Sequence, residues 1–371
     1  MDASRYKLIN AQEFDTPSLV YYKDIILKNT NRIIELARGA HRLWPHIKTH
    51  KMRDMVVMQR SMGIDRFKCA TIAEAEMLAK SGAPHILIAY PLIGTNIGRF
   101  IRLIKAFPSS TFYAIGDDFG ALSALGAAAV SQGISINVLI DVNSGTNRTG
   151  VPLLSVEAFY KKCAGINGLK LLGLHCYDGH INNSDPNERR REVRKAADIV
   201  HDIRKKLIAE GHDLPLMIMG TTPSFAIHAE YDDVYLSPGT GFVHDAGYAS
   251  LMPDLGLIPA AAVLTRVISQ PALDLITLDL GVKGISTDSS LGRGMLLGGI
   301  TVRHIVQNEE HWVFRLEGEY NADSFIVGSE HYVLPFHICS TTALYDNVLI
   351  AENGSITGSW DVSARGRKLS I

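Results

Sequence analysis

Apolar segments of strand length alternate with helical segments over the first two thirds of this 371-residue chain. The predicted strands lie at residues 42–47, 66–70, 85–89, 111–115, 135–141, 169–175, 215–219 and 234–237. Helical periodicity fills the intervals most clearly at 73–80, 97–107, 119–132 and 188–209. Regular alternation of this kind favours a parallel sheet, and eight such units fit a (β/α)8 TIM barrel better than an open doubly wound sheet.

The pattern changes after residue 246. Strand-like segments follow one another at residues 261–269, 274–279, 301–307, 312–316 and 331–334, and helical periodicity is weak. The chain is long enough for two hydrophobic cores. We therefore predict an α/β barrel domain over 24–245 and a C-terminal β-rich domain formed by 246–371 together with 1–23. The early strand at 19–22 precedes the barrel and is available to pair with the β-rich domain. We expect the basic tail at 365–368 to be solvated.

Composition excludes several classes of partner. Lys and Arg number 37 against 38 Asp and Glu, a net charge of −1, and no basic patch with interleaved aromatics is present, so nucleic acid is not an expected partner. No apolar run approaches the roughly 20 residues of a membrane span, and the N-terminus lacks the apolar core of a signal peptide. Four cysteines do not make a disulfide framework in a chain of this size. We expect a cytoplasmic protein without a membrane partner.

Polar and glycine-rich sequence follows the predicted strands. In a parallel barrel, the residues just after the carboxyl end of each strand share one rim. The rim positions are Lys48, Thr71, Tyr90, Asp117, 143–148, 177–180, 220–224 and 238–240. This distribution predicts an active site at the carboxyl end of the barrel.

Lys48 is the most reactive candidate on that rim. Residues 44–51 read Trp-Pro-His-Ile-Lys-Thr-His-Lys, and Pro45 disfavours helix for the residue before it, which places Lys48 where a strand gives way to a loop. Two histidines and Lys51 crowd it. A partly desolvated lysine near other cations has its ammonium form disfavoured and becomes an amine nucleophile, the chemistry of Schiff-base formation with an aldehyde cofactor. A basic surface loop is the alternative that these eight residues leave open.

Two glycine-containing turns follow the last two predicted strands. The first reads Gly220-Thr221-Thr222-Pro223-Ser224 and the second Pro238-Gly239-Thr240-Gly241. Small residues and hydroxyls allow backbone N–H groups to surround an anion, and the last two strands carry the usual phosphate position of a barrel. Taken singly, each turn is as well explained as a tight turn capped by threonine. Together they favour a phosphate site.

Arg148 and Tyr177 follow two other strands. An arginine can hold a phenolate oxygen, and a tyrosine can pack against a planar ring. For Arg148 the alternative is a surface ion pair, and for Tyr177 it is packing at the barrel mouth. His180 lies on the same rim and is a candidate base by position only.

His337 and Cys339 form a His-x-Cys pair in the β-rich domain. If this segment is extended, residues two apart face the same side. Imidazole and thiolate are both zinc ligands, and two protein ligands would leave positions open for substrate and water. A histidine packed beside a buried cysteine is the alternative.

Seven motifs, in this order, resemble one family over nearly the whole chain. They lie at residues 15–19, 45–51, 70–76, 147–151, 237–240, 279–288 and 335–339, and Pro-His-x-Lys-Thr-His-Lys at 45–51 is the most specific. The chain resembles the fold-type III pyridoxal-phosphate family that contains D-threonine aldolase, D-serine dehydratase and D-threo-3-hydroxyaspartate dehydratase, relatives of alanine racemase.

The resemblance implies a role for each candidate. Lys48, rather than Lys51, would bind the pyridoxal 5′-phosphate aldehyde, Arg148 would lie near the phenolic oxygen and Tyr177 beside the ring. The phosphate would be held by Gly220, Thr221, Thr222, Gly239 and Thr240. Alanine racemases place an arginine against the pyridine nitrogen; none occurs near Ser237 here, which would leave that nitrogen unprotonated. Relatives are homodimers in which each second domain closes the partner's barrel mouth, and the same is expected here.

The resemblance also implies a choice of reaction. Racemases of this fold use a tyrosine of the C-terminal domain as second base, and no tyrosine occurs between residues 271 and 300. Family lyases carry a metal pair at the positions of His337 and Cys339; the aldolases resemble His-x-Asp there and the dehydratases His-x-Cys. The expected activity is elimination of the 3-hydroxyl from a D-3-hydroxy amino acid, giving a keto acid and ammonia. Ligand softness favours Zn2+, with another divalent metal as the alternative.

Three other functions remain open. The same site can cleave the Cα–Cβ bond of its substrate in a retro-aldol reaction, as in D-threonine aldolase, with His180 as a possible base. A non-enzymatic pyridoxal-phosphate carrier and an unrelated phosphate-binding barrel are the remaining two.

Overall fold

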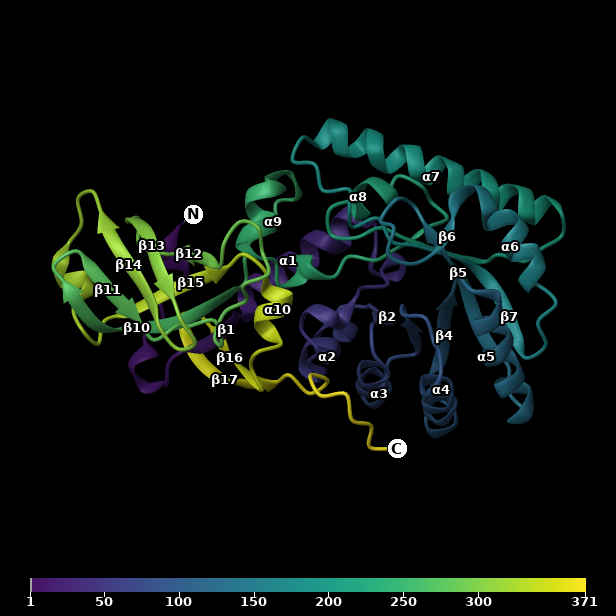
Figure 1. Ribbon diagram of the computed structural model, residues 1–371, viewed down its shortest axis with the longest axis horizontal. Helices are drawn as coiled ribbons and strands as arrows, with labels where there is room; N and C mark the ends of the chain where they lie inside the picture. The colour runs from purple at the N-terminus through teal and green to yellow at the C-terminus, as the bar shows by residue number, and fades with distance from the viewer. Residues whose placement is uncertain (1) are drawn as a thin grey trace. The chain divides into compact units, whose positions relative to one another are not determined.

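The structure, a computed structural model, describes residues 2–371 and divides into two compact units (Figure 1). One unit contains Ile33–Gly239 and the C-terminal residues Ala364–Ile371. The other contains the N-terminal residues up to Arg32 and Thr240–Ser363. We call them the α/β unit and the β-rich unit. Helix α1 (Lys23–Leu36) carries the chain from one to the other.

The α/β unit contains a curled parallel sheet in the strand order β2-β3-β4-β5-β7-β8-β9, with β6 paired to β5. The strands are β2 (Arg66–Cys69), β3 (His85–Ile88), β4 (Thr111–Gly116), β5 (Ile136–Asn143), β6 (Val151–Pro152), β7 (Leu169–Cys176), β8 (Leu216–Met219) and β9 (Tyr235–Leu236). Helices alternate with them: α2 (Arg53–Ser61), α3 (Ile72–Lys80), α4 (Thr95–Ala106), α5 (Phe119–Ser131), α6 (Val156–Cys163), α7 (Pro186–Ala209) and α8 (Phe225–His228). The predicted parallel α/β architecture is confirmed.

Segment 43–46 meets both edge strands of this sheet. Leu43 forms an isolated parallel bridge with Leu236 of β9, and His46 forms one with Lys68 of β2. The predicted strand at 42–47 is therefore present only as single-residue bridges. Pro45 has no N–H to donate to a ladder, and short 3-10 helices at Ala40–Arg42 and Ile47–Thr49 flank the segment.

Side-chain caps begin three α-helices of the α/β unit. The Thr71 hydroxyl accepts a hydrogen bond from Glu74 N at the start of α3, and Asp118 accepts one from Ala121 N at the start of α5. Asp185 caps α7, whose first residue is a proline. Threonine and aspartate are favoured caps because their oxygens satisfy N–H groups that the helix leaves unpaired. Thr71 and Asp118 follow β2 and β4 closely and so direct the chain from sheet to helix.

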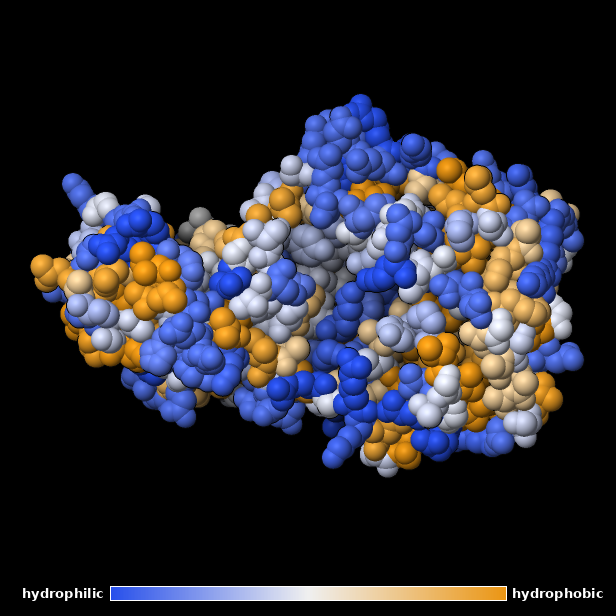
Figure 2. Space-filling view, viewed as in Figure 1, coloured by the Kyte–Doolittle hydropathy of each residue, from blue (hydrophilic) through white to orange (hydrophobic). Residues whose placement is uncertain are grey.

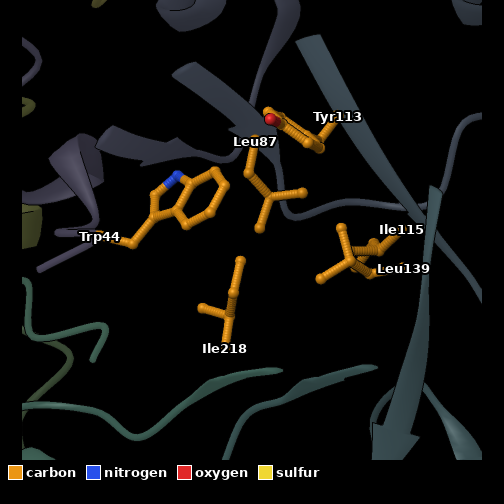
Figure 3. Close-up of a cluster of buried hydrophobic side chains, with 6 residues drawn as sticks. All are labelled: Trp44, Leu87, Tyr113, Ile115, Leu139 and Ile218. Carbon is orange, nitrogen blue, oxygen red and sulfur yellow. The ribbon is translucent and has the colours of Figure 1, made fainter. Parts of the chain in front are cut away.

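The inside of the curled sheet is apolar at its centre. Figure 3 shows six buried side chains that gather from segment 43–46 and from strands β3, β4, β5 and β8: Trp44, Leu87, Tyr113, Ile115, Leu139 and Ile218. Residues two apart on a strand face the same side, so Asp141 continues the face that Leu139 occupies on β5. The polar groups described below therefore lie on the same inner face as this apolar core.

The β-rich unit is built on a nine-stranded sheet in which the early strand β1 (Ser18–Tyr22) pairs with β10 and with β16. The other strands are β10 (Ala261–Ala272), β11 (Leu275–Leu278), β12 (Gly294–Leu296), β13 (Thr301–Gln307), β14 (Trp312–Glu317), β15 (Glu330–Pro335), β16 (Asn347–Glu352) and β17 (Ser355–Asp361). The predicted β-rich region and the pairing of the early strand with it are both confirmed. Two short helices, α9 (Ala246–Leu251) and α10 (Ile338–Thr342), belong to this unit.

The C-terminal tail lies against the α/β unit (Figure 1). Ala364 N donates to Lys51 O at 3.0 Å, Arg99 Nη2 donates to Arg367 O at 2.8 Å, and Ser370 N donates to the Glu76 carboxylate at 3.1 Å. Most side chains of the tail are exposed, as expected for a solvated segment. Backbone groups of the tail nevertheless have fixed partners on α3 and α4.

The arginine run on α7 is neutralised by acids. Arg191 pairs with Glu188, and Arg190 and Arg194 both pair with Glu230. Figure 2 shows hydrophilic side chains over the outer surface around the start of this helix. A paired, mixed-charge face is not the unopposed basic surface that nucleic acid binding requires. No helix in the part of the chain that the structure describes is both long and apolar enough to cross a bilayer.

Candidate active site

Lys48 lies in the 3-10 turn Ile47–Thr49, directly after the bridge between His46 and Lys68. His46 caps the turn, and its Nδ1 accepts a hydrogen bond from Lys48 N at 3.3 Å. Burial, reinforced by the charge of Lys48, holds the pKa of His46 well below its usual value, so the ring is a neutral acceptor. The Lys48 side chain is half-buried, and its Nζ lies 5.5 Å from the centre of the Tyr177 ring.

Lys51 does not act as the neighbouring cation that the sequence suggested. Its ammonium forms an ion pair with the buried carboxylate of Glu74 on α3. Glu74 also accepts a hydrogen bond from Ala70 N at 2.7 Å, just after β2. The positive charge of Lys51 is therefore compensated locally.

Arg148 and Tyr177 come together at the carboxyl end of the sheet, as predicted. The Arg148 guanidinium carbon lies 4.6 Å from the centre of the Tyr177 ring. The Asn143 side chain orders the loop that carries Arg148, because its oxygen accepts from Gly145 N at 3.0 Å and from Asn147 N at 3.1 Å. The ring of Tyr177 thus has both Lys48 and Arg148 within reach.

The two predicted glycine turns also meet. Gly239 N donates to Thr222 Oγ1 at 3.3 Å. A Cβ on Gly239 would lie only 3.0 Å from His46 O, so this turn packs closely against the backbone of the Lys48 turn, and a side chain here would require the backbone to shift by a few tenths of an ångström. Gly220, between β8 and the first turn, has a positive φ of 85°. These contacts place the predicted phosphate turns beside Lys48.

The sequence did not single out Asp178 as a site residue. Its carboxylate fixes the glycine turn at residues 220–224 by hydrogen bonds. Its carboxylate accepts hydrogen bonds from Ser224 Oγ at 2.7 Å, Thr221 Oγ1 at 3.3 Å and His228 Nε2 at 2.7 Å. Burial alone would raise the pKa of Asp178, but the hydrogen bonds and the charge of His228 outweigh burial and lower it. The Thr221 side chain is therefore engaged within the protein. The signal in the sequence was a carboxylate one residue after Tyr177, with a serine, Ser224, in the turn.

Thr240 belongs to the β-rich unit, where its Oγ1 lies 3.3 Å from Cys339 Sγ. Gly239 and Thr240 are consecutive, so the second glycine turn leads directly from the α/β unit to the residue that contacts Cys339. The hydroxyl of this predicted phosphate ligand is directed at the predicted metal pair.

His337 and Cys339 lie at the start of α10, and the expectation of an extended segment is wrong. His337 is the N-cap residue with φ of −140°, and Cys339 is inside the first turn. The helix starts here because Asp245 receives the first N–H, that of Ile338, at 3.1 Å. The hydrogen bond to Cys339 is the largest of the effects that raise the pKa of His337 to about 9. The two side chains are therefore neighbours because both lie at the start of a helix, and not because they alternate along a strand.

Asp288 orients His337. The Nδ1 atom of His337 lies 2.9 Å from each carboxylate oxygen of Asp288, and Ser340 Oγ donates to the same carboxylate at 2.6 Å. A carboxylate on one imidazole nitrogen fixes the tautomer that leaves the other nitrogen available for a metal. Within residues 2–371 no group of three or more His, Cys, Asp or Glu side chains is arranged to hold a metal ion. The predicted metal ligands His337 and Cys339 are thus accompanied by Asp288, which contacts His337 Nδ1.

A buried polar row on the inner face of the sheet was also missed. Lys68 Nζ of β2 lies 3.3 Å from His175 Nε2 of β7, and His175 Nδ1 lies 2.7 Å from Asp141 Oδ1 of β5. Thr149 Oγ1 donates to the other carboxylate oxygen of Asp141 at 2.9 Å. Lys68 is 2% exposed, and His175 and Asp141 are each 3% exposed. Charged residues inside apolar strands are seldom tolerated without partners, and that was the available signal.

Comparison with known proteins identifies the family. The alanine racemase N-terminal domain model matches residues 23–243, and the putative serine dehydratase domain model matches residues 260–351. A D-threonine aldolase from Arthrobacter sp is 29% identical, with 95% of this chain and 93% of that protein covered. A D-threo-3-hydroxyaspartate dehydratase from Delftia sp. is 25% identical over 94% of this chain and 97% of its own length.

Solved structures agree with this assignment. The crystal structure of D-threonine aldolase from Filomicrobium marinum superimposes with a TM-score of 0.87 at 26% identity, covering 98% of this chain and 99% of that one. Structures of the Delftia dehydratase, at 23% identity or less, share the fold with a TM-score of 0.82; they include variants of a histidine and of a cysteine two residues apart, the latter in a metal-free form. The chain is therefore an enzyme of the alanine racemase N-terminal domain family, the fold-type III pyridoxal-phosphate enzymes.

Proposed function

We propose that this enzyme is a pyridoxal-phosphate- and metal-dependent lyase that removes the 3-hydroxyl of a D-3-hydroxy amino acid. Loss of water across Cα and Cβ, followed by hydrolysis of the resulting enamine, gives a keto acid and ammonia. Substrates of this class are D-serine, D-threonine and D-threo-3-hydroxyaspartate. The relatives that match over nearly the whole chain support this substrate class.

The residue types and spacing of His337 and Cys339 are the observation that favours elimination over retro-aldol cleavage. The Delftia dehydratase has been studied as variants of a histidine and a cysteine that are also two residues apart, one of them in a metal-free form. The same residue types at the same spacing support a common role. Imidazole and thiolate favour Zn2+ over Mg2+ or Mn2+ because both are softer ligands than oxygen.

The residues around Lys48 fit pyridoxal phosphate. Lys48 Nζ has no hydrogen-bond partner within residues 2–371, so it is available to the aldehyde. Arg148 and Tyr177 would hold the phenolic oxygen and the ring. Gly220 and Thr222 would bind the phosphate with backbone N–H groups. Gly239, whose N–H donates to Thr222 Oγ1, would hold the two turns together. Thr221 would shape the first turn and Thr240 would lengthen the second. The close approach of Gly239 to His46 supports this arrangement, because a Cβ at Gly239 would lie 3.0 Å from His46 O.

In this proposal the side chains of the protein move the α-proton and orient the cofactor and Lys48. Pyridoxal phosphate, when bound, supplies a ring that withdraws electrons from the substrate α-carbon. The Nζ atom of Lys48 would take the α-proton of the substrate. Tyr177 would pack against the cofactor ring and restrict the position of Lys48, and Arg148 would present its guanidinium to the phenolic oxygen.

His337 and Cys339 would hold the metal, and Asp288 would keep His337 Nδ1 protonated. A metal bound there supplies a Lewis acid that makes the 3-hydroxyl a better leaving group. Without it, hydroxide is a poor leaving group and elimination stalls. Exhaustive chelation is therefore expected to abolish turnover while pyridoxal phosphate stays bound.

Retro-aldol cleavage to glycine and an aldehyde is the second candidate, because the D-threonine aldolases match this chain at 29% and 26% identity. It needs a base at the 3-hydroxyl. The predicted base, His180, is exposed, and its Nδ1 lies 3.0 Å from Thr146 Oγ1. A carrier without turnover predicts bound cofactor and no product.

Product identification separates these functions. The enzyme is incubated with D-serine, D-threonine and D-threo-3-hydroxyaspartate, with and without added Zn2+, and keto acid, ammonia, glycine and aldehyde are measured. Keto acid with equal ammonia is expected. Glycine with equal aldehyde would overturn elimination in favour of retro-aldol cleavage, and activity that survives complete chelation would overturn the metal role.

Two structural features complete the proposal. We infer that segment 43–46 closes the curled sheet into a (β/α)8 barrel, supported by its bridges to both edge strands. We also infer a homodimer in which the metal pair of one subunit serves the Lys48 of the other. Lys48 belongs to the α/β unit, and His337 and Cys339 belong to the β-rich unit.

A further inference from the structure

We propose that a cavity between the outer face of the parallel sheet and helices α3 and α4 is a second binding site, which takes a small organic carboxylate. The cavity has a volume of about 260 Å³, and all the residues that line it belong to the α/β unit. Two guanidinium groups line it, that of Arg99 on α4 and that of Arg367 on the C-terminal tail. The proposal goes beyond the lyase reaction and does not depend on it.

The cavity lies on the opposite side of the sheet from the buried polar row. Leu87 of β3 belongs to the apolar core inside the curled sheet (Figure 3). Side chains alternate along a strand, so the next residue, Ile88, points outward toward the helices, and it lines the cavity. The row Lys68–His175–Asp141 lies on the inner face with Leu87. The cavity is therefore separate from the polar groups inside the sheet.

The polar side chains of the cavity wall offer hydrogen-bond donors. Thr71 Oγ1 already accepts a hydrogen bond from Glu74 N at 3.1 Å, and Asn96 Oδ1 accepts one from Arg99 Nη1 at 3.1 Å. The Thr71 O–H group and the Asn96 amide N–H groups have no acceptor within residues 2–371. A ligand whose polar atoms are acceptors, as those of an ionised carboxylate are, satisfies these groups.

The positive charges of the wall are not compensated by the protein. Arg99 Nη2 donates to Arg367 O at 2.8 Å, which holds the tail beside α4 (Figure 1). In the part of the chain that the structure describes, neither Arg99 nor Arg367 forms an ion pair, and no Asp or Glu side chain lines the cavity. The arginines of α7, by contrast, are paired with glutamates. A guanidinium presents its N–H groups in one plane, which matches the two oxygens of a carboxylate.

The start of α3 adds to this positive field. Ile72 and Ala73 are the first two residues of α3, and both line the cavity. Backbone N–H groups at these positions have no partner inside their own helix. Together with the helix dipole, they favour an anion at this end of the helix.

The rest of the wall is apolar, which favours an organic acid over inorganic phosphate. Ile72, Ile88 and Leu92 line the cavity and are each at most 5% exposed. A molecule with a carboxylate at one end and a short apolar chain at the other matches both parts of the wall. The cavity is also smaller than the roughly 300–1,000 Å³ typical of sites for larger ligands, so the expected ligand is a short-chain acid.

Arginine modification in the full-length protein, loaded with pyridoxal phosphate, locates the site without any variant. Phenylglyoxal modifies accessible guanidinium groups, and peptide mass spectrometry follows Arg99, Arg367 and the exposed Arg102 of α4 in the same sample. Butyrate is the probe, and the ionic strength is held constant. Saturating butyrate is expected to suppress the modification of Arg99 and Arg367 and to leave that of Arg102 unchanged.

Isothermal titration calorimetry tests the two parts of the ligand separately. Butyrate has two more methylene groups than acetate, and their burial against the apolar wall should tighten binding by about tenfold. Arg99→Gln removes a charged donor and should weaken butyrate binding by about tenfold or more. Arg102→Gln removes the same charge from the same helix outside the cavity and should bind butyrate as the wild type does.

Three results would overturn the proposal. Arg99 that is modified equally fast with and without butyrate would rule out the site, and this comparison decides the matter even if Arg99→Gln does not fold. Inorganic phosphate that protects Arg99 as well as butyrate does would rule out an organic acid as the preferred ligand. A folded Arg99→Gln protein that binds butyrate as tightly as the wild type would exclude Arg99 from the site. None of these measurements uses turnover, so failure of the proposed lyase reaction would leave this proposal standing.

Discussion

His337 Nδ1 lies 2.9 Å from both carboxylate oxygens of Asp288, which leaves Nε2 as the ring nitrogen available to a metal. The same carboxylate accepts from Ser340 Oγ, so its orientation is set from two directions. This relationship links β-rich residues that are 49 positions apart, and it explains why a pair of ligands can be pre-ordered at the start of a short helix.

Asp288→Asn is expected to weaken metal binding by about 10- to 100-fold, because the partner that fixes the His337 tautomer is lost. Zinc titration against a chromophoric chelator measures the change. The exposed Asp323→Asn is the matched control in the same unit. Equal zinc affinity in Asp288→Asn and the control would mean that His337 is not a metal ligand supported by Asp288.

Gly239→Ala is expected to weaken pyridoxal-phosphate binding. The new Cβ would lie 3.0 Å from His46 O, a backbone atom that cannot rotate away, and such overpacking costs about 1–3 kcal/mol. The change displaces either the phosphate turn or the Lys48 turn. Visible absorbance during cofactor titration measures the affinity. Gly98→Ala has open space around its Cβ and should bind normally; normal binding in Gly239→Ala as well would contradict the placement of the phosphate.

The Asp178–His228 pair predicts a pH dependence of stability. The pKa of Asp178 in the folded protein lies below its usual value of about 3.9. Its ionised form therefore stabilises the fold above that usual value, and the contribution is lost as the pH falls through the lower, folded-state pKa. Asp178→Asn should cost about 2 kcal/mol at neutral pH and lose less stability than wild type on acidification. Urea midpoints at neutral and acidic pH give both quantities; parallel losses in the two proteins would refute the assignment.

A mixture of two inactive variants tests the proposed dimer. Lys48→Ala lacks the amine and His337→Ala lacks a metal ligand, so each homodimer is expected to be inactive. If the metal pair serves the partner's Lys48, half of the dimers after subunit exchange contain one intact site, which restores about a quarter of wild-type activity. The same variants measured singly are the controls. A protein that is monomeric in solution would rule out a site shared between two subunits. Within a dimer, a failure to recover activity after verified exchange would show that both residues act in one subunit.

Sequence patterns predicted the parts of this fold that periodicity determines. Strands such as β5 and β7, and the pairing of β1 with the C-terminal sheet, follow from alternation and from where the helical pattern stops. The segment at 42–47 did not form a regular strand, because Pro45 interrupts any ladder there. The segment of His337 is helical because a distant carboxylate, Asp245, receives the N–H of Ile338, and no local pattern reports that.

Residue type and rim position predicted the residues of the candidate site. They did not predict the side chains that form hydrogen bonds and ion pairs around it. Lys48, Arg148 and Tyr177 meet as expected, because the carboxyl ends of parallel strands converge. Lys51 was misread as an active cation, since its compensation by Glu74 depends on the packing of α3. Lys68, His175 and Asp141 come from three strands far apart in sequence, so their meeting depends on the curl of the sheet.

Reductive trapping tests the central claim most directly. The purified enzyme is treated with borohydride in the presence of pyridoxal phosphate, digested, and analysed by mass spectrometry for the lysine that carries the pyridoxyl group. The account predicts modification of Lys48 in wild type and its loss, together with the visible absorbance, in Lys48→Arg. Modification at Lys51 or Lys68 instead, or a Lys48→Arg protein that stays equally coloured and active, would contradict it.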